Sequence, residues 1–161
     1  PILTDYTVIP TNLALAIYDG DLYEVSVLAS RLNHLWVEAV CGKLKMDFRY
    51  SNDLGWHTFP LLNLTEKQIT DLETCAKNIL IAQENAFPKS LNELYNEGFA
   101  SDAMPSDLRD AHDHNDEVLE RIYIGRRFRN DTERLEKLFD LYTKMTATAG
   151  ASKKRKAGAV A

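Results

Sequence analysis

The sequence lacks several patterns that define whole classes of protein. No run of about 18 apolar residues occurs, so we predict no transmembrane helix. Its two cysteines, Cys41 and Cys75, form neither a disulfide framework nor a zinc signature, and a reducing cytoplasm is the simplest setting. The chain begins at Pro1 with no Met, basic leader or signal-peptide core, so we expect a piece of a longer protein that is not secreted.

Charge is unevenly distributed along the chain, whose net charge is −5. Residues 1–60 carry four Lys and Arg against seven Asp and Glu, and residues 61–125 carry five against thirteen. Residues 126–161 reverse the balance, with ten basic side chains against four acidic ones. Phosphate attracts residues 126–161 and repels residues 61–125, so we expect the acidic helices to face away from any nucleic acid.

Residues 44–50 alternate between apolar and charged side chains, which predicts a strand with two different faces. The apolar face comprises Leu44, Met46, Phe48 and Tyr50, and the charged face comprises Lys45, Asp47 and Arg49. A row of donor, acceptor and donor is suited to the hydrogen-bonding edges of base pairs in the major groove. The same row is typical of a solvent-exposed edge strand, where charges discourage aggregation. The pattern by itself favours the second interpretation and leaves the first open.

The first 63 residues are predicted to combine strands with one helix. Period-two alternation indicates extended structure over residues 5–19, and a 3.6-residue apolar period indicates one helix over residues 22–41. Residues 55–59 are predicted as a further strand that pairs with residues 44–50. The result is a β-hairpin whose tip carries residues 49–53.

The chain from residue 64 onward is predicted to be helical. Capping and breaking signals place helices at 66–86 after a Thr65–Gln68 capping box, at 91–95 after Ser90, from Pro105 to Ile122, and from Asp131 to Tyr142. A basic tail rich in Ala, Gly and Ser follows and is predicted to be disordered. The predicted fold class is α+β, mostly α-helical, with N-terminal strands, a helix and a β-hairpin followed by a helical C-terminal domain. The predicted domains are 1–63 and 64–149, with the tail at 150–161.

Residues 110–116 are rich in side chains that bind metals. His112 and His114 are two residues apart, however, so on one helix they point in different directions. Two histidines share a helical face at a spacing of four, as in metal-binding helices. We therefore interpret this segment as solvated or capping and predict no metal site.

Arg126, Arg127 and Arg129 form the strongest basic cluster of the folded part, directly after Gly125, where the chain turns. Guanidinium groups bind phosphate well, and they pair equally well with carboxylates. These arginines either bind phosphate or form ion pairs with the acidic helix that precedes them. The sequence favours neither reading.

A set of short motifs extends from residue 5 to residue 147. The longest is Gly42 to Ser51, which ends in Arg49-Tyr50-Ser51 and has Phe48 before it; Thr58-Phe59-Pro60 follows at a short distance. Further motifs are Ser30 to Trp36, Leu94-Tyr95, Met104-Pro105, Leu108 to His112, Asn115-Asp116 and Arg134 to Tyr142. Together they resemble the C-terminal region of MmeI-like enzymes, single-chain restriction–modification proteins that methylate adenine in DNA. In that family Tyr is commoner at the position of Phe48.

The resemblance implies the end of a target recognition domain followed by a helical C-terminal domain, with the catalytic parts upstream. An adenine methyltransferase of this kind needs a glycine-containing cofactor loop and an Asn/Asp-Pro-Pro-aromatic motif, and the chain has no Pro-Pro. It also has no acidic nuclease motif of the Asp…Glu-x-Lys type. We expect no catalytic residue, cofactor or metal on this chain, and S-adenosylmethionine in the upstream domain of a cytoplasmic bacterial or archaeal enzyme.

The resemblance also implies that the positions of Lys45 and Asp47 read the base pair beside the methylated adenine. Lysine donates to O6 and N7 of guanine, and a carboxylate accepts from the amine of cytosine, so we predict that guanine follows the target adenine. Arg49 is a further candidate base reader, and the candidate DNA contacts are Lys43, Asn52, Arg126, Arg127 and Arg129. The expected partners are double-stranded DNA and the upstream domains of the parent chain. The alternative is a helical protein-interaction or scaffold module that reads no bases.

Overall fold

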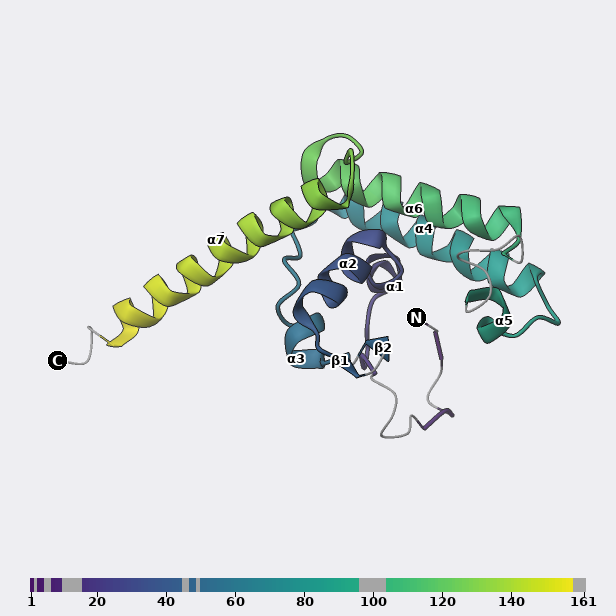
Figure 1. The fold of residues 1–161 in the computed structure, drawn as a ribbon, viewed down its shortest axis with the longest axis horizontal. Coiled ribbons are helices and arrows are strands. Elements are labelled where there is room, and N and C mark those ends of the chain that lie inside the picture. The colour runs from purple at the N-terminus through teal and green to yellow at the C-terminus, as the bar shows by residue number, and fades with distance from the viewer. Residues whose placement is uncertain are drawn as a thin grey trace. The chain divides into compact units, whose positions relative to one another are not determined.

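The computed structural model describes residues 1, 3–4, 7–9, 16–44, 47–48, 50–95 and 104–157, with the backbone alone for 43–44, 47–48, 52 and 148–157. These residues are mainly helical (Figure 1). The helices are α1 (Leu22–Leu28), α2 (Arg31–Val40), α3 (Asn52–Gly55), α4 (Glu66–Asn85), α5 (Leu91–Tyr95), α6 (Ser106–Ile124) and α7 (Asp131–Ala157). Two short strands, β1 (Lys43–Leu44) and β2 (Asp47–Phe48), pair antiparallel.

The predicted α+β fold class is wrong for the part of the chain that the structure describes. Strand there amounts to two residues in β1 and two in β2, and the remaining elements are helices. Within the segment 5–19, expected to be extended, residues 7–9 and 16–19 carry no strand. The other residues of that segment lie outside the described ones.

The predicted β-hairpin between residues 44–50 and 55–59 is also wrong. Leu44 pairs with Asp47, so the chain reverses direction inside the segment that was predicted as one strand. Residues 52–55 form α3 and residues 56–58 are turns, which leaves no partner strand there. The alternation reports side-chain chemistry, whereas local backbone hydrogen bonds, such as Gly55 N–H to Ser51 O at 2.6 Å, decide the backbone path.

The single helix predicted over residues 22–41 is divided into α1 and α2. At the break, the Ser30 hydroxyl donates to the Val27 carbonyl at 2.6 Å. The N–H of Arg31, the first residue of α2, donates to Asp116 Oδ1 at 2.7 Å. A carboxylate from α6 therefore caps the start of α2. The sequence around Arg31 does not predict this cap, because the capping residue lies far along the chain.

Capping signals in the second half of the sequence are confirmed. The Thr65 hydroxyl accepts from Gln68 N–H at 3.3 Å while Gln68 Oε1 accepts from Thr65 N–H at 2.9 Å, which forms the predicted capping box of α4. The Ser90 hydroxyl accepts from Glu93 N–H at 3.3 Å and starts α5. Gly125 ends α6 with φ of 77°, a left-handed conformation that favours glycine.

The start of α7 differs from the prediction by one residue. Asn130, rather than Asp131, is the cap, because its side-chain oxygen accepts from Glu133 N–H at 2.9 Å. The helix then continues to Ala157, so residues 150–157 of the segment predicted as a disordered tail have a helical backbone. No helix among the described residues is long and apolar enough to cross a membrane.

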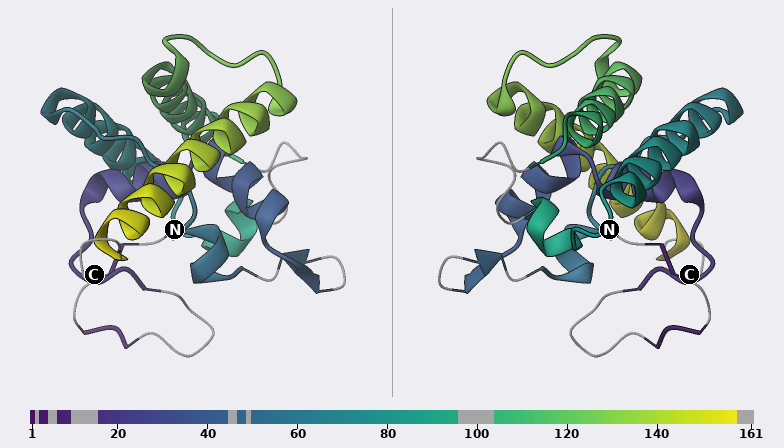
Figure 2. Two further views of the ribbon diagram at one scale, coloured as in Figure 1. Left: turned by 90° about the vertical axis from the view of Figure 1, so that its left-hand side faces the viewer. Right: turned by 90° about the vertical axis from the view of Figure 1, so that its right-hand side faces the viewer.

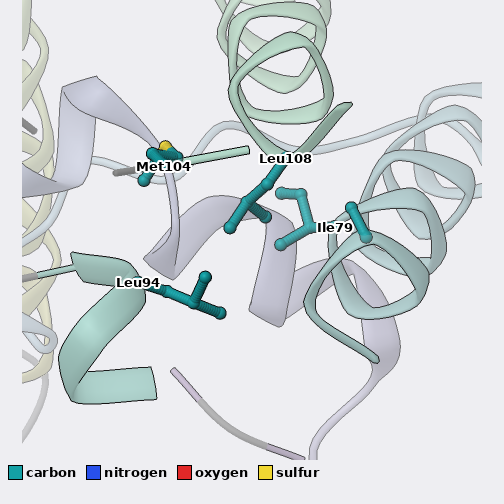
Figure 3. Close-up of a cluster of buried hydrophobic side chains, with 5 residues drawn as sticks. Ile79, Leu94, Met104 and Leu108 are labelled. Atoms are coloured by element: carbon teal, nitrogen blue, oxygen red, sulfur yellow. The ribbon is translucent and has the colours of Figure 1, made fainter. Parts of the chain in front are cut away.

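The chain divides into two compact units that interleave along the sequence. The first unit comprises Pro1–Arg31 and Asn63–Arg127, and in it α4 packs against both α1 and α6 (Figure 1). Its core includes a cluster of buried side chains from α4, α5, α6 and the segment just before α6 (Figure 3). The cluster comprises Ile79, Ala82, Leu94, Met104 and Leu108. Burying each of the large side chains stabilises the fold by about 1.5–3 kcal/mol.

The second unit comprises Leu32–Leu62 and Phe128–Ala161 and contains α2, β1, β2, α3 and α7. Trp36 of α2 is 1% exposed and packs against two aromatic rings of α7. Its ring centroid lies 5.0 Å from that of Phe139 and 5.5 Å from that of Tyr142, in tilted arrangements that are favourable for aromatic pairs. The ribbon of β1 and β2 follows the end of α2 and leads into α3 (Figure 2).

Candidate nucleic-acid interface

The predicted base-reading residues lie in and around the ribbon of β1 and β2. Lys43 is the first residue of β1 and Asp47 the first of β2. Asn52 is the first residue of α3, whereas Lys45 and Arg49 lie outside the described residues. The structure therefore gives the backbone frame of the candidate interface, and the chemistry of its side chains comes from the sequence.

Two contacts hold the segment where the ribbon rejoins the body of the second unit. Cys41, which precedes β1, is 6% exposed, and its Sγ lies 4.0 Å from the carbonyl oxygen of Ser51, which follows β2. The Tyr50 ring lies against the backbone of Gly55, where an added Cβ would be 2.8 Å from Tyr50 Cε2. Burial raises the pKa of the Tyr50 hydroxyl, and the nearby Cys41 thiol adds to the rise. The ends of the ribbon are thus packed against fixed neighbours.

A third contact ties the residues after α3 to α2. The indole Nε1–H of Trp36 donates to the Thr58 hydroxyl oxygen at 3.1 Å. The same hydroxyl donates to the carbonyl oxygen of Leu54 in α3. Thr58 therefore uses its donor and an acceptor at once, and it joins α3 to a buried tryptophan.

In the first unit, Arg127 pairs with the acidic helix that precedes it. Its Nε lies 3.9 Å from Oε2 of Glu120, a side chain of α6 that is fully buried. Arg126 donates from its guanidinium to the Arg127 carbonyl at 2.8 Å. The Arg127 side chain is nevertheless 48% exposed, so the ion pair leaves its guanidinium accessible to an external phosphate.

In the second unit, the backbone around Arg129 is fixed by the first turn of α7. Arg129 N–H donates to Glu133 Oε2 at 2.7 Å. The preceding Phe128 is 6% exposed, and the Arg134 guanidinium carbon lies 5.9 Å from the centre of its ring. Arg129 itself is exposed.

The histidine- and aspartate-rich segment 110–116 supports packing within the first unit. Asn115 is fully buried: its Oδ1 accepts a short hydrogen bond from the Ser26 hydroxyl, and its Nδ2 donates to the Ser26 carbonyl at 3.0 Å. His112 Nε2 lies 2.8 Å from the Tyr95 hydroxyl. No group of three or more metal-ligating side chains is found among the residues that the structure describes. The segment therefore connects helices α1, α5 and α6.

The partly buried His112 makes stability depend on pH. Burial lowers its pKa, against the opposing effects of Asp113 and a hydrogen bond to the Ala29 carbonyl. As the pH falls from about 6.5, the pKa in the unfolded chain, toward the lower pKa in the folded chain, the unfolded chain binds a proton that the folded chain does not, and the free energy of unfolding falls by up to about 1 kcal/mol per pH unit.

Urea unfolding between pH 7.5 and 5.5 tests this expectation. Replacing His112 with Gln should flatten the fall in stability over that interval. Replacing the exposed His114 with Gln, two residues along the same helix, should leave the fall as it is. An equal pH dependence in wild type and His112→Gln would show that other groups cause it.

Sequence reasoning missed the residues that hold the candidate interface in place. The motif Thr58-Phe59-Pro60 marked its segment without giving Thr58 a partner, because the tryptophan that bonds it lies 22 residues away. Gly55 was assigned to a strand, whereas it ends a helix and receives an aromatic ring. A glycine two residues after the turn residues Ser51 to Asp53 is the one local signal of a close backbone approach.

Comparison with known proteins gives consistent matches. Models of the MmeI target recognition domain and the MmeI C-terminal domain match residues 2–63 and 64–149. DNA methyltransferase A of Bacillus subtilis (strain 168) is 40% identical over 136 residues, which cover 84% of this chain and 15% of that protein. A solved structure of the Type IIL restriction–modification enzyme MmeI in complex with DNA is 32% identical, with a TM-score of 0.74, over 80% of this chain and 17% of that one. The chain thus spans about a sixth of these relatives.

Proposed function

The chain belongs to the MmeI family, and we propose on that basis that it is the DNA-recognising C-terminal part of a longer, site-specific adenine DNA methyltransferase. The observation that carries the proposal is the position of β1 and β2. This ribbon lies inside the part that resembles a target recognition domain, and its sequence places donors and acceptors in alternation. The similar enzyme of known structure was solved in complex with DNA.

We propose that the side chains of Lys45 and Asp47 read one base pair next to the methylated adenine. Lysine donates to guanine and aspartate accepts from cytosine, so the pair selects G·C in one orientation. Arg49 contacts a neighbouring base pair or a phosphate. Each good contact contributes about 1–3 kcal/mol against the wrong base.

The remaining candidate contacts in this proposal bind phosphate. Arg126, Arg127 and Arg129 lie in residues 126–161, the segment with excess positive charge, and a duplex attracts such residues without regard to base sequence. Lys43 begins the ribbon and Asn52 begins α3 after it, and both contact the DNA backbone beside the bases. The helices of residues 64–149 brace the recognition part. Catalysis and S-adenosylmethionine belong to the parent chain upstream, in the cytoplasm.

The experiment that tests this function exchanges donor and acceptor in the full-length enzyme. The double variant Lys45→Glu, Asp47→Arg should rotate the preferred pair from G·C to C·G beside the methylated adenine and leave the other positions unchanged. Mapping methylated sites by sequencing measures the change, which should exceed about tenfold in relative methylation of the two sites.

The control is Lys67→Glu, Asp71→Arg, which makes the same charge exchange on the exposed surface of α4. It should preserve the wild-type recognition sequence. If the Lys45, Asp47 exchange also preserves it at normal activity, residues 43–48 are a solvated edge and the base readers lie upstream.

One observation favours a second candidate function, a scaffold that binds other domains of the parent. Residues 61–125, which form most of the first unit, carry thirteen acidic and five basic side chains, and phosphate repels such a surface. Salt-dependent binding with preference for one DNA sequence supports base reading. Equal binding of every sequence by the full-length protein supports the scaffold.

A further inference from the structure

We propose that Thr58 and Trp36 are positioning residues that fix the orientation of the β1–β2 ribbon during base reading. The inference rests on the proposed function, because it assigns these residues a role in the accuracy of that readout. Neither residue belongs to the predicted base-reading set. Both lie in the second unit, so the argument stays within one compact body.

The ribbon itself is small and has few means of holding its own direction. β1 and β2 contribute two residue pairs, Lys43 with Phe48 and Leu44 with Asp47. An isolated two-stranded hairpin is marginally stable in water. The orientation of the ribbon therefore depends on the residues at its two ends, Cys41 and Tyr50, and on the contacts that hold these two residues in place.

Tyr50 is fixed by α3. Its ring lies so close to Gly55 that no Cβ fits between them, with 2.8 Å from an added Cβ to Tyr50 Cε2 and 3.0 Å to Cζ. A shift of α3 therefore moves Tyr50, and Tyr50 lies two residues after the end of β2. The position of α3 therefore determines the position of the ribbon.

The helix α3 is in turn fixed by Thr58. The Thr58 hydroxyl donates to the Leu54 carbonyl in α3 and accepts from Trp36 Nε1 at 3.1 Å. Trp36 is 1% exposed and contacts the rings of both Phe139 and Tyr142, which connects α2 to α7 at a buried position. A continuous path of contacts thus runs from the core of the second unit through Thr58 and α3 to the ribbon.

Base readout is sensitive to such positioning. A binding site must hold its groups within about 0.5 Å of the productive geometry, and residues on a short ribbon meet that limit only through their supports. Loss of the Trp36–Thr58 bond should loosen the ribbon while leaving its reading side chains intact. Discrimination between base pairs should then fall more than the methylation of the correct site.

The test compares Thr58→Val with Thr58→Ser in the full-length enzyme. Valine removes the hydroxyl at nearly constant volume, whereas serine keeps it. The measured quantity is the ratio of methylation rates on duplexes that carry G·C and C·G beside the target adenine. Thr58→Val removes both hydrogen bonds of this hydroxyl and should lower the ratio at least about threefold, with cognate kcat within about twofold of wild type. Thr58→Ser should retain the ratio.

Two further variants make the result specific. Trp36→Phe removes the donor and keeps an aromatic ring, so it should lower the ratio as Thr58→Val does, and the double variant should be no worse than the poorer single one. Thr143→Val on α7 removes a hydroxyl that donates to the Phe139 carbonyl of its own helix at 2.8 Å, and it should leave the ratio unchanged.

The outcomes separate this inference from the proposed function. If Thr58→Val slows cognate and non-cognate methylation equally, the bond has a general structural role and the inference fails. It also fails if the ratio is unchanged in both Thr58→Val and Trp36→Phe while the Lys45, Asp47 exchange does rotate specificity. If that exchange has no effect, the proposed function itself fails.

Discussion

Replacing Ile79 with alanine is expected to lower the free energy of unfolding by about 3–4 kcal/mol. Ile79 is 1% exposed in the cluster that α4 shares with α5 and the start of α6 (Figure 3). Its neighbours Leu94 and Leu108 are fully buried and come from two other segments, so they cannot all move in to fill the space. The loss therefore combines the transfer of the deleted atoms with the cost of a cavity.

Ile81, two residues along the same helix, provides the matched control because it is 54% exposed. Its replacement with alanine should change the free energy of unfolding by less than about 1 kcal/mol, since alanine also has the higher helix propensity. Urea unfolding followed by far-UV circular dichroism measures both variants. Similar losses at the two positions would mean that the cluster of Figure 3 does not form the core of the first unit.

The helices of the second half were predictable because their signals are local. Thr65 and Gln68 stand three residues apart and satisfy each other's backbone groups, and Gly125 takes the left-handed conformation that ends α6. An error of one residue at the start of α7 arose because Asn130 and Asp131 are both good capping residues. Capping residues thus predict where helices begin and end, with an error of one residue where two adjacent residues can both serve as the cap.

The first half was less predictable because distant residues decide its structure. The division between α1 and α2 depends on Asp116, whose carboxylate accepts from Arg31 N–H across 85 positions of sequence. The alternation of residues 44–50 predicted a continuous strand, but side-chain pattern does not specify where the backbone reverses. The antiparallel pairing of Leu44 with Asp47 shows a reversal within that pattern.

The candidate interface was predictable in its chemistry and unpredictable in its support. Lysine and aspartate at nearby positions suggest base recognition from the sequence alone, and that suggestion stays a prediction. The hydrogen bond from Trp36 to Thr58 brings together two residues whose separate patterns, a helical apolar stripe and a turn, give no sign of each other. Tertiary contacts of this kind appear only when the helices are assembled.

A buried polar pair in the first unit gives the second large expected effect. Asn115 and Ser26 are both fully buried and exchange two hydrogen bonds, one of them from Asn115 Nδ2 to the Ser26 carbonyl. Asn115→Asp keeps the shape of the side chain but replaces this donor with a carboxylate oxygen. At pH 7 the change places a charge in a buried site opposite a carbonyl oxygen, and we expect a loss of about 3–5 kcal/mol.

The loss in Asn115→Asp should depend on pH in a defined direction. The Ser26 hydroxyl can still donate to the new carboxyl, but burial opposite the Ser26 carbonyl raises the pKa of that carboxyl above the value of about 3.9 in the unfolded chain. The penalty is therefore absent at low pH and grows as pH rises through that value. As long as the carboxyl is protonated, it can donate to the Ser26 carbonyl as the amide does. Urea unfolding of wild type and variant at pH 4.5 and 7.5 should therefore show a larger difference at pH 7.5.

The control variant Asn78→Asp, on the exposed face of α4, should differ from wild type in free energy of unfolding by less than about 0.5 kcal/mol at both pH values. A difference for Asn115→Asp that stays constant with pH would mean that the new carboxylate reaches water, and that α1 and α6 are not closed around this pair.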